Sequence, residues 1–288
     1  MTQAVDVLAP SRLAADLNLG PVELTVSDLS RSLEFYTGAL GLKLLSQEGN
    51  VARLGAGKTP LLTLAGGART PTRPSSPGLY HFALLLPTRA DLGRFVRHFA
   101  GLGLRLGQGD HLVSEAFYTN DPDGHGIEVY WDRPRETWPW QDGQVQMGVD
   151  PIDVPGLLAE PGAQDPFTGL PDRAVLGHVH LRVTDLPAAR AFYAGLLGFD
   201  VMADMPGALF VSVGGYHHHL GLNTWQSAGG PPAPADSAHL LGLTLILPDA
   251  DDLARLQARL DAAAYPYTSQ EGALTVRDPS GTFLRFTA

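Results

Sequence analysis

The chain has 288 residues, of which 44% are hydrophobic and 17% charged, and these fractions are typical of a folded protein with room for two domains. Its formal net charge of −10 disfavours nucleic acid or an anionic membrane surface as a partner. The absence of cysteine excludes disulfide bonds, thiolate nucleophiles and thiolate metal sites.

The N-terminal tail, residues 1–17, lacks the apolar stretch behind basic residues that marks a secretory signal. The longest apolar runs, at 82–86 and 243–247, are too short to cross a bilayer. We therefore expect a soluble cytoplasmic protein without a membrane partner.

The first quarter of the chain has the pattern of a strand, a helix and three further strands. Hydrophobic and more polar residues alternate from Val22 to Val26, as in a half-buried strand. Asp28 is a suitable N-cap for the next helix, which is predicted to end between Gly38 and Gly41. The three strands are predicted at 43–47, 51–54 and 61–64.

The second quarter repeats this order. It contains a predicted strand at 81–86, a helix at 89–100, and strands near 104–106, 114–119 and 126–131. The third quarter runs from 177 to about 222, and the fourth from 239 to the C-terminus. Together they predict an α+β protein built from four βαβββ modules.

The segment 133–176 is rich in Pro, Gly and Asp and is predicted to be a linker. Trp138 and Trp140 near its start indicate that it packs on a surface. We expect one domain at 18–132 and a second at 177–288, each with two modules.

The two halves of the chain are similar to each other. Residues 26–41 align with 183–198 without a gap, and the DPDG turn at Asp121 matches the DPSG turn at Asp278. The aligned helices share an Asp-Leu start, a Phe-Tyr pair and a Leu-Gly end. Self-similarity of this kind predicts a repeat architecture.

Two histidines and one glutamate occupy related positions in this repeat. His81 and His178 lie in the first strands of their modules, and Glu128 lies in a closing strand. Two imidazoles and a carboxylate suit Fe(II) or Mn(II) in a site that keeps coordination positions open. A lone histidine in a strand is more often a hydrogen-bonded structural residue. The metal hypothesis therefore requires that the three side chains meet in space.

The four modules resemble the vicinal-oxygen-chelate superfamily, which includes glyoxalase I, bleomycin-resistance proteins and type I extradiol dioxygenases. The resemblance covers nearly the whole chain except the tail and the linker. It rests on GHVHLRVTDL from Gly177, FYAGLLG from Phe192, DPDGHGIEVY from Asp121 and YHHHLGLNTW from Tyr216. It implies two vicinal-oxygen-chelate domains in which paired modules form half-closed mixed β barrels. The fold alone does not identify the reaction.

The chain is most similar to the catechol 2,3-dioxygenase-like group, in which two histidines and one glutamate bind Fe(II). The resemblance implies that His81, Glu128 and His178 are these ligands, and their types do not separate Fe(II) from Mn(II). Extradiol enzymes of four modules keep the metal in the C-terminal half, but here Gly242 and Arg285 occupy the ligand positions of the fourth module. Either modules two and three pair across the linker, or two chains of a homo-oligomer supply the ligands. We expect pairing within the chain.

The resemblance also implies three catalytic residues. The histidine pair of the family aligns with the run 217–219 and assigns His218 as the active-site base, with His217 or His219 as alternatives. Tyr118 is expected to hydrogen-bond the substrate, although an aromatic residue in a strand is more often part of the core. His111 is expected to act as an acid or a substrate ligand.

Several other histidines are expected to have structural roles. Strand alternation places His178, His180 and Arg182 on one face, so His180 is expected in the cavity wall without binding a metal. His125 is expected to be a solvated turn residue, and His98 a structural residue on a helix.

The resemblance implies a non-haem Fe(II)-dependent extradiol dioxygenase that cleaves a catechol-type aromatic diol with O2, in aromatic hydrocarbon catabolism. One alternative is a glyoxalase-like lyase or isomerase, whose sites usually have four protein ligands. Another is a drug-sequestering resistance protein, which would not need the two histidines and the glutamate. The sequence does not identify the catechol or the oligomeric state.

Overall fold

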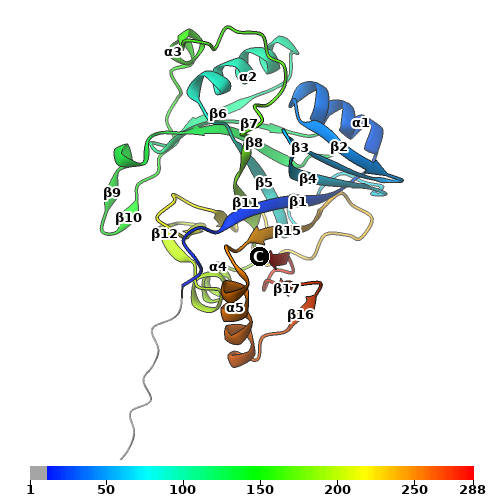
Figure 1. Ribbon diagram of the computed structural model, residues 1–288, viewed down its shortest axis with the longest axis vertical. Helices are drawn as coiled ribbons and strands as arrows, with labels where there is room; N and C mark the ends of the chain where they lie inside the picture. The colour runs from blue at the N-terminus through cyan, green and yellow to red at the C-terminus, as the bar shows by residue number, and fades with distance from the viewer. Residues whose placement is uncertain (1–11) are drawn as a thin grey trace, which may run out of the picture.

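The computed structural model describes residues 12–288 and contains two eight-stranded sheets (Figure 1). Residues 1–11 of the predicted tail lie outside the described residues. Further along the tail, Leu13 and Leu17 are buried in the hydrophobic core. No helix within residues 12–288 is long and apolar enough to cross a membrane.

The first module follows the order predicted from the sequence. Its elements are β1 (Asn18–Val26), α1 (Leu29–Glu34), a π-helical turn (Phe35–Ala39), β2 (Lys43–Glu48), β3 (Val51–Ala56) and β4 (Thr59–Gly66). The Asp28 side chain accepts a hydrogen bond from the backbone N–H of Arg31, so the predicted N-cap is confirmed.

The second module repeats the arrangement. Its elements are β5 (Gly78–Leu85), α2 (Arg89–Gly101), β6 (Gly107–Asp110), β7 (Ser114–Asn120) and β8 (Gly126–Asp132). The strand predicted near 104–106 is wrong, because the chain leaves α2 through a left-handed turn at Gly103 (φ +70°) and β6 begins only at Gly107. In the sequence Leu104 looked like a residue of a strand, but in the structure it is exposed and lies before β6.

The third and fourth modules have the same order. The third consists of β11 (Val175–Arg182), α4 (Leu186–Arg190), a π-helical turn (Ala191–Leu196), β12 (Asp200–Met205), β13 (Ala208–Ser212) and β14 (Leu220–Asn223). The fourth consists of β15 (Leu240–Ile246), α5 (Ala250–Ala262), β16 (Tyr267–Gln270), β17 (Ala273–Arg277) and β18 (Phe283–Thr287).

Each curled sheet combines one module from each half of the chain. One sheet has the order β16-β17-β18-β15-β1-β4-β3-β2, and the other has the order β12-β13-β14-β11-β5-β8-β7-β6. Their central pairs, β1 with β15 and β5 with β11, are antiparallel and lie side by side in Figure 1. Modules two and three therefore pair within one chain, as expected. The two half-barrels do not coincide with the segments 18–132 and 177–288.

The linker packs on the second sheet, as expected, but only one of its two tryptophans takes part. It forms the hairpin of β9 (Trp140–Gln141) and β10 (Gln144–Val145) and the helix α3 (Val154–Ala159), which lies against α2 (Figure 1). Trp138 is buried in a cluster with Val145 and Tyr216, whereas Trp140 is exposed. The linker is therefore folded, and it contacts both the second and the third module.

The repeated sequence signature joins the two sheets. The Tyr36 hydroxyl donates to Asp121 Oδ2 (3.0 Å), and the Tyr193 hydroxyl donates to Asp278 Oδ2 (2.9 Å). Each bond links the helix of the first module in a half to the DP-G turn of the second. The tyrosine of each Phe-Tyr pair thus makes a buried hydrogen bond, in addition to the packing expected from the sequence.

Candidate active site

Three adjacent strands bring the predicted triad together. Ala83 on β5 pairs with Glu128 on β8 and with His178 on β11, so the three residues form one row across the sheet. His81 lies two residues before Ala83 and points to the same face. Because Ala83 has only a methyl side chain, the space above it is open to the three larger groups.

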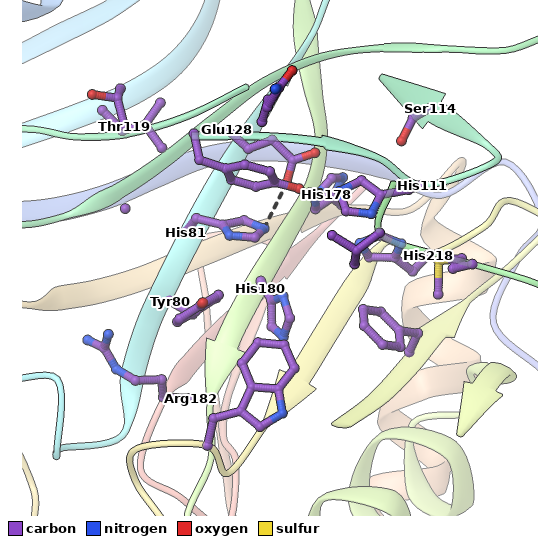
Figure 2. Close-up of a pocket in the computed structure, with 18 of the residues that line it drawn as sticks. Tyr80, His81, His111, Ser114, Thr119, Glu128, His178, His180, Arg182 and His218 are labelled. Carbon is purple, nitrogen blue, oxygen red and sulfur yellow. Dashed lines mark hydrogen bonds and ion pairs between the residues drawn. The ribbon is translucent and has the colours of Figure 1, made fainter. Parts of the chain in front are cut away.

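The three side chains are buried and within bonding reach of one ion. His81 Nε2 lies 3.0 Å and His178 Nε2 lies 3.1 Å from Glu128 Oε2. One ligand atom from each residue lies within 4.8 Å of the others. Figure 2 shows the three groups converging. The side chains therefore meet in space, as the metal hypothesis requires, and their role as ligands stays a prediction.

The donor set fits a divalent metal. His81 Nε2 is buried and lacks a hydrogen bond of acceptable geometry, although it lies beside the carboxylate. A buried nitrogen without such a partner is unusual unless another group, such as an ion, uses it. Burial opposes ionisation of Glu128, but the two histidines outweigh it and hold the carboxyl pKa well below its usual value. Burial lowers the pKa of His81. A carboxylate and a neutral imidazole are the forms that bind metals.

Of the three consecutive histidines, His218 lines the cavity. Its ring centroid lies 4.1 Å from that of His178, and its Nδ1 lies 2.8 Å from His217 Nδ1. His217 Nε2 in turn lies 2.9 Å from Asp132 Oδ1. His219 points elsewhere, with its Nδ1 2.7 Å from Ser212 Oγ. Of the three histidines, His218 is therefore the one that faces this cavity, and its role as the active-site base stays a prediction.

These contacts define which nitrogen of His218 is free. A carboxylate only accepts, so His217 donates from Nε2 to Asp132, and in a neutral imidazole the Nδ1 of His217 is then unprotonated. His218 then donates from Nδ1 to His217, which leaves its Nε2 unprotonated. Burial lowers the pKa of His218 well below its usual value and favours this neutral form. His218 therefore offers a hydrogen-bond acceptor at the cavity.

Tyr118 and His111 form a second polar pair in the cavity wall. Tyr118 pairs with Glu128 across β7 and β8, and its hydroxyl lies 2.6 Å from His111 Nε2. His111 Nδ1 lies 2.7 Å from the carbonyl of Gly148 and must donate to it, so in a neutral imidazole the Nε2 of His111 is the acceptor in its contact with Tyr118. The loop after His111 turns through Leu112 in the left-handed region (φ 69°), which returns the ring to Tyr118. Both residues line the cavity, and their catalytic roles remain predictions.

The cavity has a volume of about 760 Å³, which suits a small aromatic ligand with a substituent. Tyr80, Phe210 and Trp225 provide aromatic walls, and Met147 to Val149 of the linker contribute to the lining. His180 lies in the wall and accepts from the Asn223 amide (3.0 Å), which confirms the position expected for it.

Sequence reasoning missed two features of this site. Tyr80 lines the cavity together with its neighbour His81, because a bulge in the β5–β11 pairing skips Tyr80 and breaks the alternation of faces. Asp132 was also not identified, since its contact with His217 joins distant segments and leaves no local pattern.

One of the minor predictions is wrong. His125 is not a solvated turn residue but is buried, and its Nε2 lies 2.9 Å from the carbonyl of Thr25. The turn that carries it is covered by the first module, which the local sequence did not reveal. His98 has the structural role expected for it, with its ring stacked on Phe167 and Nε2 3.2 Å from the Gly38 carbonyl.

Comparison with known proteins gives matches over both halves of the chain. The family model described as Glyoxalase/Bleomycin resistance protein/Dioxygenase superfamily matches residues 18–129 and 175–286. A protein of Bacillus subtilis (strain 168) named Catechol-2,3-dioxygenase is 42% identical over 278 residues, which cover 94% of this chain and 97% of the relative.

Solved structures share the fold. A putative dioxygenase from Bacillus subtilis subsp. subtilis str. 168 has a TM-score of 0.66 at 14% identity, covering 96% of this chain and 86% of that one. Glyoxalase I from Zea mays has a TM-score of 0.56 at 16% identity, covering 94% and 92%. At these identities the likeness concerns the fold alone.

Proposed function

This chain belongs to the Glyoxalase/Bleomycin resistance protein/Dioxygenase superfamily, and we propose that it is a non-haem Fe(II)-dependent extradiol dioxygenase that cleaves a catechol-type diol with O2. The observation that carries the proposal is the convergence of His81, Glu128 and His178 at one side of an aromatic-walled cavity. The 42% identity to a protein named Catechol-2,3-dioxygenase, over nearly the full length of both chains, supports the same reaction.

The triad is proposed to hold the metal from one side. Bound there, Fe(II) would supply a Lewis acid with open coordination positions for the diol oxygens and O2. The same ligand types accept Mn(II), so metal analysis must identify the ion. Within residues 12–288 this group has three buried donor side chains, which favours the dioxygenase over a lyase that uses four protein ligands.

The remaining polar residues are proposed to handle protons and orient the ring. His218 offers an unprotonated Nε2, which can accept the proton of a diol hydroxyl and return it later. Tyr118 and His111 share a hydrogen bond that can be redirected to a substrate oxygen. The rings of Tyr80, Phe210 and Trp225 provide apolar walls for the substrate ring and exclude water from it.

The test is anaerobic loading with Fe(II), followed by catechol and air. We expect about one iron per chain, a ring-cleaved product that absorbs in the near-ultraviolet to visible range, and two added oxygen atoms by mass spectrometry. His81→Ala and Glu128→Ala should each weaken iron binding by more than the roughly 10–100-fold caused by losing an outer-shell partner. Iron content and ring cleavage are measured on the same preparation of each protein.

Matched controls separate loss of ligation from general damage. His98 lies on α2 away from the cavity lining, and Glu48 is exposed on β2, so His98→Ala and Glu48→Ala should keep their iron. Retention of iron by both triad variants would refute the proposed site. Bound iron without cleavage of any diol would refute the reaction and favour a lyase. Failure of the wild-type protein to bind iron would favour sequestration.

A further inference from the structure

Arg182 is a buried cation in the wall of the cavity. It lies on β11, on the same face as His178 and His180, and its residue is 8% exposed. Figure 2 shows Arg182 and His218 on opposite sides of the triad in that view. Four residues along a strand separate the Cα atoms of His178 and Arg182 by about 13 Å. The guanidinium therefore belongs to the cavity but not to the proposed metal site.

The guanidinium has no acidic partner among the residues that the structure describes. Its one hydrogen bond runs from Nε to the carbonyl of Ser76 (3.2 Å), which leaves its terminal nitrogens without a described partner. Desolvation lowers the pKa of Arg182, and no carboxylate contributes a compensating charge. Burying a charge without a counter-charge is costly, so such a residue is informative.

The charges of the cavity leave one place for an anionic ligand group. Apart from histidines, the charged residues of the lining are Glu128 and Arg182. Glu128 is already in contact with His81 and His178. A guanidinium presents paired N–H groups that match the two oxygens of a carboxylate. An aromatic diol with an acidic substituent would neutralise Arg182 without disturbing the triad.

We propose that Arg182 is a specificity-determining residue that binds a carboxylate on the substrate, so that the preferred substrate class is aromatic diols bearing an acidic side chain. This inference rests on the proposed ring-cleaving function. In this arrangement the diol oxygens of the substrate lie at the triad. The carboxylate of the substrate lies at the opposite end of its aromatic ring, past the side chains of Tyr80, His180 and Trp225, which form one wall of the cavity. Those three rings pack on one another with centroids 5.0–5.4 Å apart.

A purely structural role for Arg182 makes a different prediction. Its bond to Ser76, which is itself buried, anchors the segment between β4 and β5, of which Pro74 lines the cavity. If anchoring were the whole role, replacing Arg182 would impair neutral and acidic diols to the same extent. If Arg182 instead binds the substrate carboxylate, replacing it should impair only the diols that carry an acidic side chain.

The test compares 3,4-dihydroxyphenylacetate with its uncharged amide, 3,4-dihydroxyphenylacetamide, and with catechol. The iron-loaded wild-type protein should show a kcat/KM for the acid about 10–100-fold above that for the amide, as expected for a buried charge-assisted pair. Arg182→Gln should remove this preference through a higher KM for the acid. The values for the amide and catechol should change by less than about 3-fold. Arg182→Lys should restore part of the preference.

A matched control variant tests whether the effect is specific to Arg182, and a binding measurement tests the preference without turnover. Arg190→Gln alters a half-buried arginine that pairs with Asp204 outside the cavity lining and should keep the wild-type preference. Equilibrium binding of the acid and the amide under argon measures the preference independently of turnover. Equal affinity of the wild-type protein for both ligands, or a parallel loss for both in Arg182→Gln, would overturn the proposal. Binding preference without cleavage of any diol would instead refute the proposed reaction.

Discussion

His218 has a defined hydrogen-bonding pattern because two residues behind it determine which of its nitrogens carries the proton. Asp132 accepts from His217, and a neutral His217 then accepts from His218, which holds the proton of His218 at Nδ1. A free imidazole would exchange between two tautomers, only one of which offers Nε2 as an acceptor. Asp132 also accepts from the Tyr216 hydroxyl (2.8 Å), which restrains the carboxylate. We therefore infer that His217 positions the proposed base.

Replacing His217 tests this positioning role. His217→Leu removes the acceptor for His218 and should lower kcat about 10–100-fold, part of the 10²–10⁴-fold that a positioned base contributes. KM and iron content should change little, because His217 does not line the cavity. His217→Asn places an amide oxygen near the position of Nδ1 and should recover part of kcat. Steady-state kinetics with catechol measure both effects.

His219→Gln is the control for this prediction. His219 lies next in the chain but contacts Ser212 and does not line the cavity, so its variant should keep the wild-type kcat. A wild-type kcat in His217→Leu, or equal losses in the leucine and asparagine variants, would show that His217 does not orient the base.

The sequence predicted the residues of the site where the strands follow regular alternation. His178, His180 and Arg182 do line one cavity, and the repeat placed His81 and Glu128 in strands that prove to be adjacent. It did not predict Tyr80, because a bulged residue does not follow the period of a strand. A bulge of one extra residue does not produce a residue pattern by which it can be recognised in the sequence.

At the level of elements, the tyrosine of each repeated helix connects the two sheets. Asp121 accepts from Tyr36, and its other oxygen accepts backbone N–H groups of Asp123 (2.9 Å) and His125 (2.8 Å). Asp278 has the equivalent contacts with Tyr193 and with its own turn. The recurrence of this bond explains why tyrosine and aspartate both occur in the internal repeat.

Removing the tyrosine hydroxyl should weaken the molecule measurably. Tyr36→Phe leaves Asp121 buried with one partner fewer and should lower the free energy of unfolding by about 1–3 kcal/mol. Tyr193→Phe should have a similar effect, and the two losses should add, because the bonds lie in separate repeats. Urea denaturation of the single and double variants measures these changes.

Tyr267→Phe is the matched control, because that hydroxyl bonds Asp261 at the surface. Its variant should unfold at nearly the same urea concentration as the wild type. If Tyr36→Phe and Tyr193→Phe were as stable as this control, the buried bonds would not hold the sheets together.

At the scale of the whole molecule, the site requires both halves of the chain. The pairing of β5 with β11 brings His81 and Glu128 of the first half to His178 of the second. The order of modules along the chain did not determine this pairing, which was indicated only by the residue types at the expected ligand positions. The fourth module has Gly242 and Arg285 where ligands were expected, whereas modules two and three have the full set.

Metal binding should therefore stabilise the molecule against unfolding, because the proposed ligands meet only when the halves are paired. A ligand that binds only the folded state adds about 2.7 kcal/mol at a free concentration of 100 times its Kd. Anaerobic Fe(II) should raise the urea midpoint of the wild-type protein by a corresponding amount. His178→Ala should lose this increase, since it removes the ligand from the second half.

His98→Ala should keep the full increase, because His98 packs on Phe167 outside the cavity lining. The comparison is made between midpoints with and without metal for each variant, so a difference in the stability of the metal-free proteins does not affect it. If Fe(II) stabilised His178→Ala as strongly as the wild type, the ion would be held within one half, and the pairing of β5 with β11 would not be needed to build its site.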